Sequence, residues 1–365
     1  MNKNFYSLGL MSGTSIDGID ASIIKSDGKQ SLKVIDNFYL EYEESFRKKL
    51  KKSIDSCITK SRFQNQLKNI KKIEKKITYL HEKACKLILN RNKNINIDLI
   101  GFHGQTYLHK PQKKISIQIG NAELLFKLTG INIISHFRDN DILNGGEGAP
   151  LTPIYHKLIK FKKKILNPVS FLNIGGIANI TYFDEKNVMR SRDIGPGNCL
   201  IDKWIRLKSD KKYDKKGLIA RSGTVDKFIL NRSLDSFYNS KISKKKSYDI
   251  NDFDLSFVKE LTFKNGASTL TEFTADICSK KITNKNIYVS GGGRRNTFLL
   301  ESIKKKINCK IRLIDTIGID GDFVESQAFA YLAVRSYLKL PISFPTTTGV
   351  KNDCTGGEAF KFKEQ

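Results

Sequence analysis

The sequence has 365 residues, of which 39% are hydrophobic and 10% aromatic, a composition that is typical of a globular protein and excludes an intrinsically disordered one. Its length is more typical of two domains than of one. The formal net charge of +27 raises the question of an anionic partner, whereas no apolar run reaches about 18 residues, so we expect no membrane partner.

The first half of the chain is predicted to alternate strands and helices. The strands FYSLGL and DASIIKS flank the glycine-rich stretch GLMSGTSIDGID, Gly9 to Asp20, and LKVIDNFYLEY continues with extended character. Apolar residues at every third or fourth position predict helix from about Glu44 to Leu89. A buried strand, Ile95 to Gly101, then ends in a polar loop. KKISIQIGN leads into a helix closed by Gly130, INIISHFR is another strand, and NGGEGAPLTP is a loop that opens a helix near Pro153.

The second half repeats this layout. Val169 to Asp184, VSFLNIGGIANITYFD, is again strand, glycine turn and strand, which suggests a duplicated α/β unit with a cleft between two lobes. RDIGPGNCLIDKWI is predicted to be a strand end, a turn and a helix start. NIYVSGGGRRNTFLLESIKKK is strand, turn and helix, and ESQAFAYLAVRSYL is a strong helix. Residues 205–265 are polar, lysine-rich and poorly patterned, and the tail is rich in loops.

The positive charge is spread through the chain rather than concentrated. Lysine runs such as FRKKLKK and NIKKIEKK have no interleaved aromatic residues of the kind that stack on bases, so we expect solvated lysines and no nucleic-acid partner. Six scattered cysteines without a close pair predict reduced thiols and a cytoplasmic protein. The short N-terminal apolar run, soon followed by Asp17 and Asp20, predicts no signal peptide.

Four glycine turns follow apolar strands, at Gly9–Gly18, Gly175–Gly176, Gly195–Gly197 and Gly291–Gly293. Backbone N–H groups in such turns can surround phosphate oxygens, because glycine allows close approach. None matches the Walker or dinucleotide-binding pattern, and each alone is better explained as a plain turn. Four of them beside Asp, Ser, Thr and Asn are harder to dismiss as plain turns than any one alone.

These motifs resemble, in order, the signatures of the anhydro-N-acetylmuramic acid kinase family. GLMSGTSIDGID is similar to the opening G-x-M-S-G-T-S-x-D-G-x-D, and the likeness continues through FHGQTYLHKP, SIQIGN, FRDNDILNGGEGAPLTPIYH, NIGGIANIT, DIGPGN, VSGGGRRN, ESQAFAYLA and SFPTTTG. It covers nearly the whole chain except about 205–265. The resemblance implies a two-lobed α/β fold like that of sugar kinases, Hsp70 and actin, with a duplicated sheet and helix unit and a central cleft. We expect an N-terminal lobe of residues 1–132 plus about 340–365, and a C-terminal lobe of 133–339.

The resemblance also implies a reaction with ATP and Mg²⁺. Such an enzyme opens 1,6-anhydro-N-acetylmuramic acid with water and phosphorylates O6, giving N-acetylmuramic acid 6-phosphate and ADP in peptidoglycan recycling. A carboxylate deprotonates the attacking water, while Mg²⁺ and backbone donors stabilise the transferring phosphoryl group. A homodimer is a further expectation from the family. Two alternatives stay open: a kinase of the same fold for a different amino sugar, and a non-catalytic ATP-binding or basic nucleic-acid-binding protein.

The resemblance assigns roles to individual residues. Asp193 is the expected general base, although an aspartate there also suits a helix cap. The expected nucleotide-binding residues are Gly13, Thr14, Ser15, Ile16, Asp17, Gly18, Ile19, Asp20, Gly195, Gly291, Gly292 and Gly293. The expected substrate residues are His103, Gln105, Arg138, Asp139, Asn179 and Glu325. The planar fork of Arg138 suits the lactyl carboxylate of muramic acid. The metal ligands stay unassigned, with Asp17 or Asp20 able to act through water.

Several positions depart from the family pattern. His136 stands where aspartate is usual, Glu147 replaces a glutamine and Ser326 an alanine. The segment P-P-K-S-T-G-R-E is reduced to KKKSYDIND, of which Lys246 and Ser247 are recognisable. We expect these changes to alter sugar contacts or lobe closure and activity to survive, because the glycine loops and the expected base are intact.

Overall fold

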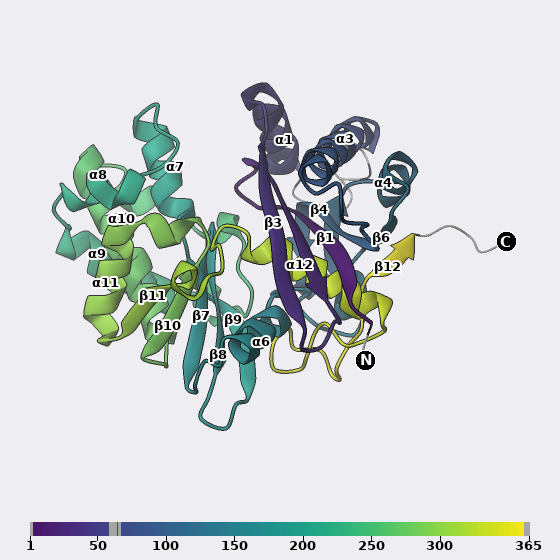
Figure 1. Cartoon of the computed structure of the whole chain (residues 1–365). Coiled ribbons are helices and arrows are strands. Elements are labelled where there is room, and N and C mark those ends of the chain that lie inside the picture. The colour runs from purple at the N-terminus through teal and green to yellow at the C-terminus, as the bar shows by residue number, and fades with distance from the viewer. Residues whose placement is uncertain (1–2, 58–63, 65–66, 361–365) are drawn as a thin grey trace. The chain divides into compact units, whose positions relative to one another are not determined.

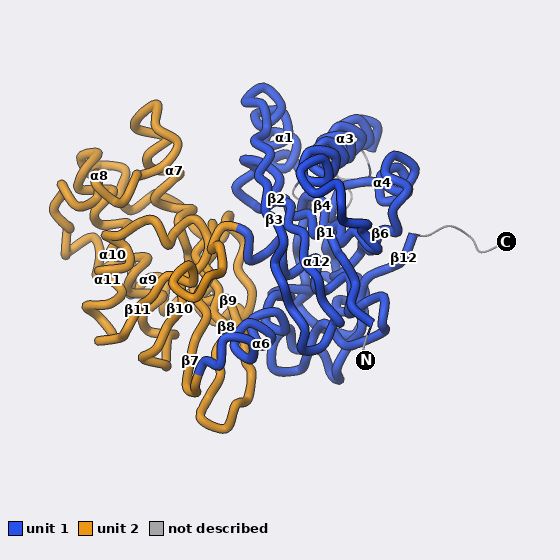
Figure 2. The backbone as a smooth tube through the Cα atoms, viewed as in Figure 1, with its two compact units in different colours: residues 1–165, 323–365 blue, residues 166–322 orange. Residues whose placement is uncertain are grey.

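The computed structural model describes residues 3–57, 64 and 67–360. The chain forms two compact units, unit 1 of residues 1–165 with 323–365 and unit 2 of residues 166–322 (Figure 2). These bounds differ from the expected lobes, since residues 133–165 and 323–339 fall in unit 1. The physical reason is pairing and packing: β6 (Asn132–Ser135) is hydrogen-bonded to β4, and α12 (Val324–Tyr337) packs on β1, β2 and β4.

The sheet of unit 1 has the strand order β12-β6-β4-β1-β2-β3, with β5 paired to the end of β4. The first three strands form an antiparallel meander, and β4 and then β6 are added in parallel beside β1. The remaining strand bounds are β1 Phe5–Ser12, β2 Gly18–Ser26, β3 Leu32–Glu41, β4 Leu99–Lys110, β5 Ile115–Ile119 and β12 Glu358–Phe360.

Unit 2 repeats this topology in a five-stranded sheet of order β11-β10-β7-β8-β9. Here too an antiparallel meander comes first, and β10 and β11 are added in parallel beside its first strand. The duplicated α/β unit predicted from the two glycine-turned hairpins is therefore confirmed. The strands are β7 Val169–Ile174, β8 Ile177–Phe183, β9 Met189–Pro196, β10 Asn286–Ser290 and β11 Lys310–Leu313.

Helices cover both faces of the unit 1 sheet. Alternate strand residues such as Leu8 and Leu10 join the core formed with α1, α3 and α4, while α12 lies on the opposite face (Figure 1). Within the helix predicted over 44–89, the described residues include α1 and α3, and residues 58–63 and 65–66 between them lie outside the described part of the chain. The helix bounds are α1 Glu44–Ser56, α3 Leu67–Arg91, α4 Ala122–Thr129, α5 Asp139–Leu143 and α6 Pro153–Lys162.

Two glycines allow α12 to approach the sheet closely. Gly9 of β1 and Gly101 of β4 are register partners. A Cβ added at Gly9 would lie 1.9 Å from the carbonyl oxygen of Ser326, and one at Gly101 would lie 2.3 Å from that of Phe329. Both glycines are therefore required for packing, and the first glycine of GLMSGTSIDGID seats a helix rather than a ligand.

Residues 205–265 contain regular structure that the sequence pattern did not predict. Trp204 is fully buried in an apolar cluster built from α7, α9, α10 and the turns between them, and Gly266 lies against its ring. The lysines between the apolar positions obscure the helical periodicity, so the sequence pattern did not predict this core. The helices of unit 2 are α7 Cys199–Lys208, α8 Leu218–Arg221, α9 Lys227–Asn239, α10 Phe263–Lys281 and α11 Thr297–Ile307.

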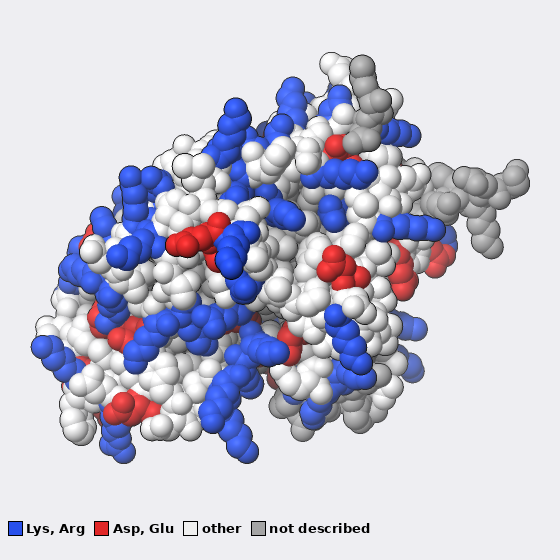
Figure 3. All heavy atoms as spheres, turned by 90° about the horizontal axis from the view of Figure 1, so that it is seen from below, with Lys and Arg blue, Asp and Glu red and all other residues white. Residues whose placement is uncertain are grey.

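The surface reflects the basic composition. Lysine and arginine side chains are spread over much of the face seen in Figure 3, with small acidic groups between them. Among the described residues, no helix has the length and apolarity needed to cross a membrane. All six cysteines are free thiols.

Candidate active site

A row of polar side chains crosses the sheet of unit 2. Ser290 of β10 is paired with Asn173 of β7, Asn173 with Asn179 of β8, and Asn179 with Asp193 of β9. A bulge beside Asn179 brings Asp193 rather than Ile194 opposite it. Since paired residues share a face of the sheet, the four side chains lie in line, and Asp193 is the carboxylate among them.

Asp193 is buried and held by hydrogen bonds. Its Oδ2 accepts a bond of 2.8 Å from the Tyr248 amide and lies 3.3 Å from the Ser247 hydroxyl, while its own N–H donates to the Lys246 carbonyl. The donors belong to KKKSYDIND, so this divergent segment directly fixes the expected base. Asp193 does not cap α7, because the residue at that position is Asn198.

The glycines between β10 and α11 serve different purposes. Gly291 has φ +77°, and a Cβ there would lie 2.4 Å from Asn173 Oδ1. Gly293 is buried, and its Cβ would lie 2.2 Å from Ile174 Cγ2. Gly292 is exposed, with open space around an added Cβ. Gly292 is therefore where a ligand can come closest to the backbone of this loop.

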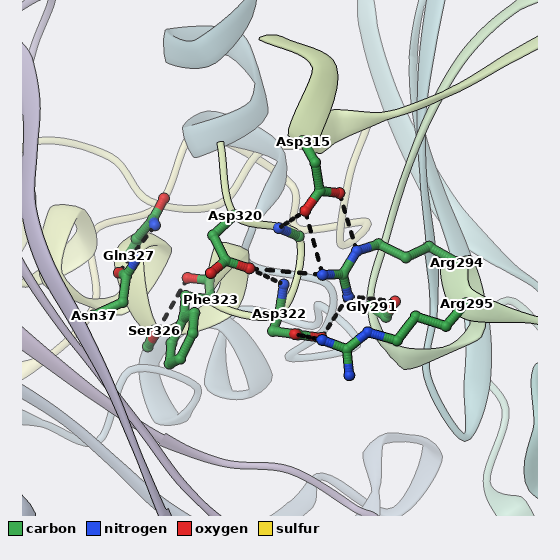
Figure 4. Close-up of polar contacts among 11 residues, drawn as sticks. Asn37, Gly291, Arg294, Arg295, Asp315, Asp320, Asp322, Phe323, Ser326 and Gln327 are labelled. Carbon is green, nitrogen blue, oxygen red and sulfur yellow. Dashed lines mark hydrogen bonds and ion pairs between the residues drawn. The ribbon is translucent and has the colours of Figure 1, made fainter. Parts of the chain in front are cut away.

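Arg294 anchors the same loop to the segment that ends unit 2. Its guanidinium, only 5% exposed, donates from Nε to Asp315 Oδ2 at 3.0 Å and from Nη1 to the Gly291 carbonyl at 3.2 Å. It also bonds Asp322, and Asp320 Oδ1 lies 3.6 Å from its Nη2 (Figure 4). Three aspartates and one carbonyl thus fix the arginine that follows the glycines.

In unit 1, the loop between β1 and β2 is tied down at its base. Ser12 Oγ lies 2.7 Å from Gln105 Oε1, 2.9 Å from the Tyr42 hydroxyl and 3.0 Å from the Gly18 carbonyl. Gln105 Nε2 donates to the Gly13 carbonyl at 3.2 Å. Gln105 therefore positions the glycine loop, although it was expected on the sugar side.

The tip of this loop is exposed while its apolar residues are not. Thr14, Ser15 and Asp17 are exposed, and the Ser15 hydroxyl donates to Asp17 Oδ1 at 2.5 Å. Ile16 has φ +56° and a buried side chain, and Ile19 is fully buried in the core. These two residues can offer a ligand only backbone groups.

His103 and Arg138 form a bonded pair. The His103 ring Nδ1 lies 2.9 Å from the Gly104 carbonyl, and Nε2 lies 3.1 and 3.0 Å from Arg138 Nε and Nη2. Burial, and next the charge of Arg138, hold the pKa of His103 well below its usual value. The ring is therefore neutral and accepts from Arg138, whose Nη1 donates to the Gly148 carbonyl at 2.7 Å. Both His103 and Gln105 lie inside β4, not in a loop after a shorter strand as expected, because β5 pairs with its second half.

Asp141, for which the sequence predicted no role, supports this pair. It is 1% exposed, and its Oδ1 accepts from the Gly148 amide at 2.6 Å and its Oδ2 from the Thr348 hydroxyl at 2.5 Å. The carbonyl of the same Gly148 holds Arg138. One buried carboxylate thus joins the loop NGGEGAP to the tail segment FPTTTG.

Asp139 and Glu325, the two remaining expected substrate residues of unit 1, have different neighbours. Asp139, at the start of α5, lies 3.1 Å from His136 Nδ1, and that hydrogen bond raises the pKa of His136. Glu325, in the first turn of α12, is half-buried. Burial raises the pKa of Glu325, while the charge of Arg138 opposes the rise. Glu325 thus belongs with the Arg138 group.

Comparison with known proteins decides the family. The family model described as anhydro-N-acetylmuramic acid kinase matches residues 5–361. The chain belongs to the anhydro-N-acetylmuramic acid kinase family. It is 48% identical to the kinase of that name from Pelagibacter ubique, over 99% of this chain and 100% of the other, and 36% identical to the one from Agrobacterium fabrum, over 96% and 97%. A ROK family glucokinase structure from Streptomyces griseus is 12% identical with a TM-score of 0.40, over 90% of this chain and 99% of that one.

Within this kinase family member, the expected site residues fall into groups inside each unit. Unit 1 joins the stretch 13–20 to Gln105, and His103 to Arg138. Unit 2 pairs Asn179 with Asp193. Gly195 stands apart, since a Cβ there would lie 2.6 Å from Ile277 Cγ2, which explains the glycine by packing. The residues of these groups for which the sequence predicted no role are Asn173, Ser290, Asp141 and Arg294.

Alanine substitutions at Gly292 and Gly293 are expected to have different effects, the first on ATP binding and the second on stability. Gly292→Ala should leave the thermal midpoint unchanged and raise the KM for ATP roughly tenfold, because the added methyl group occupies open space that a nucleotide would use. Gly293→Ala is the matched control and should lower the midpoint, since its Cβ collides with Ile174. An unchanged KM in folded Gly292→Ala would remove Gly292 from the nucleotide site.

Loss of the buried carboxylate is expected to destabilise unit 1. In Asp141→Asn an amide N–H₂ group replaces one of the two accepting oxygens, so either the Gly148 amide or the Thr348 hydroxyl loses its acceptor. This loss should cost about 1–3 kcal/mol in the free energy of unfolding. Urea denaturation measures the change. Glu123→Gln, on the exposed face of α4, is the control and should have almost no effect. A midpoint for Asp141→Asn equal to that of the control would contradict this role.

Proposed function

We propose that this protein opens 1,6-anhydro-N-acetylmuramic acid with water and transfers the γ-phosphoryl group of ATP to O6. The observation that carries the proposal is Asp193, a buried carboxylate at the end of a polar row and oriented by Ser247 and Tyr248. An oriented carboxylate can take a proton from water as that water attacks the anomeric carbon. The C1–O6 bond then breaks, and the freed O6 attacks the phosphorus with ADP as the leaving group.

The chain offers backbone cradles that suit the phosphates of ATP. The exposed tip of the 13–17 loop carries hydroxyl groups on Thr14 and Ser15, and Gly292 permits close approach. We propose that each of these loops, within its own unit, suits phosphate oxygens of ATP. Asp17 and Asp20 are the carboxylates at the first loop that fit Mg²⁺ through water. When bound, Mg²⁺ would offset charge on the transferring phosphoryl group.

The sugar side is assigned to the group around Arg138. A neutral His103 and the Gly148 carbonyl hold its guanidinium in one orientation. A planar, oriented guanidinium suits a carboxylate, and muramic acid carries one on its lactyl group. We further propose that the protein works in the cytoplasm, in peptidoglycan recycling, and as a homodimer, as its family suggests.

The experiment is sugar-dependent release of ADP, with 1,6-anhydro-N-acetylmuramic acid, N-acetylmuramic acid and N-acetylglucosamine compared. We expect the anhydro sugar to be used with the highest kcat/KM. Preference for another amino sugar would instead favour the kinase with altered specificity. Absence of turnover with all three, together with salt-sensitive binding to DNA or RNA, would favour the non-catalytic protein.

A further inference from the structure

A lysine lies behind the segment that orients Asp193. Lys281, the last residue of α10, has its Nζ 2.5 Å from the Tyr248 hydroxyl and 4.7 Å from the centroid of the Tyr248 ring. The Tyr248 hydroxyl also lies 3.4 Å from the Ser243 carbonyl, to which it can donate. The hydroxyl can thus accept from Lys281 and donate to Ser243 at the same time, which fixes the ring.

The main chain of Tyr248 makes the connection to the expected base. Its amide donates to Asp193 Oδ2 at 2.8 Å, and its ring packs 5.4 Å from that of Phe253 in the core of unit 2. Tyr248 is thus held at its hydroxyl, its ring and its amide. A shift of the ring would move the amide that sets the direction of the carboxylate.

The charges around Lys281 come from three parts of unit 2. Arg192 and Asp193 face it from β9, Cys278 from its own helix, and Tyr248 from the 240–252 segment. Burial, and next Arg192, lower the pKa of Lys281 to about 8. Burial, and next the charge of Asp193, raise the pKa of Tyr248 to about 12. At neutral pH the pair is therefore an ammonium donating to a neutral phenol.

We propose that Lys281 is a positioning residue for Asp193, acting through the hydroxyl and backbone of Tyr248. This inference rests on the proposed function, in which Asp193 is the base. In this role Lys281 contributes to the precision with which the carboxylate meets water. The family segment P-P-K-S-T-G-R-E has threonine after K-S, whereas this chain has Tyr248 after Lys246 and Ser247. The contact between Lys281 and Tyr248 therefore belongs to the altered segment of this chain.

The test compares kcat at pH 7 for wild type, two single variants, their double variant and one control variant. Lys281→Met keeps most of the stem and removes the charge, and Tyr248→Phe keeps the ring and the amide. Each should lower kcat about tenfold at an unchanged KM for ATP, because small displacements of a reacting group are costly. The double variant should be no slower than either single one, since both remove the same contact. Lys280→Met, next on the helix and over the Tyr238 ring at 3.9 Å, is the control and should keep the wild-type kcat.

The pH profile gives a readout that a merely structural role would not move. The wild-type kcat should fall as the pH rises through about 8, where Lys281 loses its proton. Lys281→Arg should restore most of the activity and lack that fall. Lys281→Met should be slow at every pH and also lack it.

The outcomes separate this inference from the proposed function. If wild type turns over the anhydro sugar and Lys281→Met matches it in kcat and in pH profile, the positioning role is refuted while the function stands. Additive losses in the double variant would also refute it. If wild type does not turn over that sugar, the proposed function fails first.

Discussion

Asp193→Asn is expected to lower kcat for the anhydro sugar by about 10²–10⁴-fold, the usual contribution of a general base. The amide has the size of the carboxylate and can still accept from the Tyr248 N–H through its oxygen, so the thermal midpoint and the KM for ATP should stay close to wild type. What the amide lacks is the basicity to take a proton from water. Steady-state ADP release with the sugar measures the loss.

The control for this variant is a carboxylate with another task in the 240–252 segment, the segment whose Ser247 and Tyr248 contact Asp193. Asp252 pairs with Lys245 within the 240–252 stretch, so Asp252→Asn should keep most of the activity. Near-normal turnover by folded Asp193→Asn would mean that another group activates the water, and the polar row of unit 2 would lose its assigned purpose.

Arg138→Lys is expected to lower kcat/KM for the anhydro sugar by about 10–100-fold, which corresponds to loss of one or two charge-assisted hydrogen bonds. A lysine cannot donate to His103 Nε2 and the Gly148 carbonyl while presenting a planar fork to a carboxylate. The KM for ATP should not change. The loss should appear in the KM for the sugar when the two substrates are varied separately.

A matched arginine shows whether the effect is local. Arg190 pairs with Asp184 in unit 2, with 42% of its side chain exposed, and Arg190→Lys should behave as wild type. A sugar analogue without the lactyl carboxylate adds a second comparison. If Arg138→Lys lowered kcat/KM by the same factor for the sugar with the lactyl carboxylate and for the analogue without it, Arg138 would be supporting the fold of the site rather than binding this group.

The sequence predicted the glycine turns and their neighbouring strands well, because apolar runs interrupted by glycine leave few other structures. It could not separate the tasks of individual glycines. Gly9 seats α12 and Gly293 avoids Ile174, whereas Gly292 faces open space. The difference depends on which atoms the fold brings within 4 Å, and local sequence does not contain that information.

The same limit applies to the polar side chains. Asn179 was selected beside its glycine turn, but Asn173 and Ser290 join it only through strand register across β10, β7 and β8. Gln105 was expected on the sugar side, and its bond to the Gly13 carbonyl depends on β1 lying beside β4. Register and strand order are long-range properties, so periodicity along one segment cannot supply them.

In the proposed reaction, water opens the anhydro bond while ATP phosphorylates the oxygen that is released. Turnover in H₂¹⁸O, with rapid quenching and mass analysis of the product, tests it most directly. We expect an N-acetylmuramic acid 6-phosphate that carries one ¹⁸O atom on the sugar and none in the phosphate group. A product that keeps the anhydro bond, or one with ¹⁸O in its phosphate group, would contradict it.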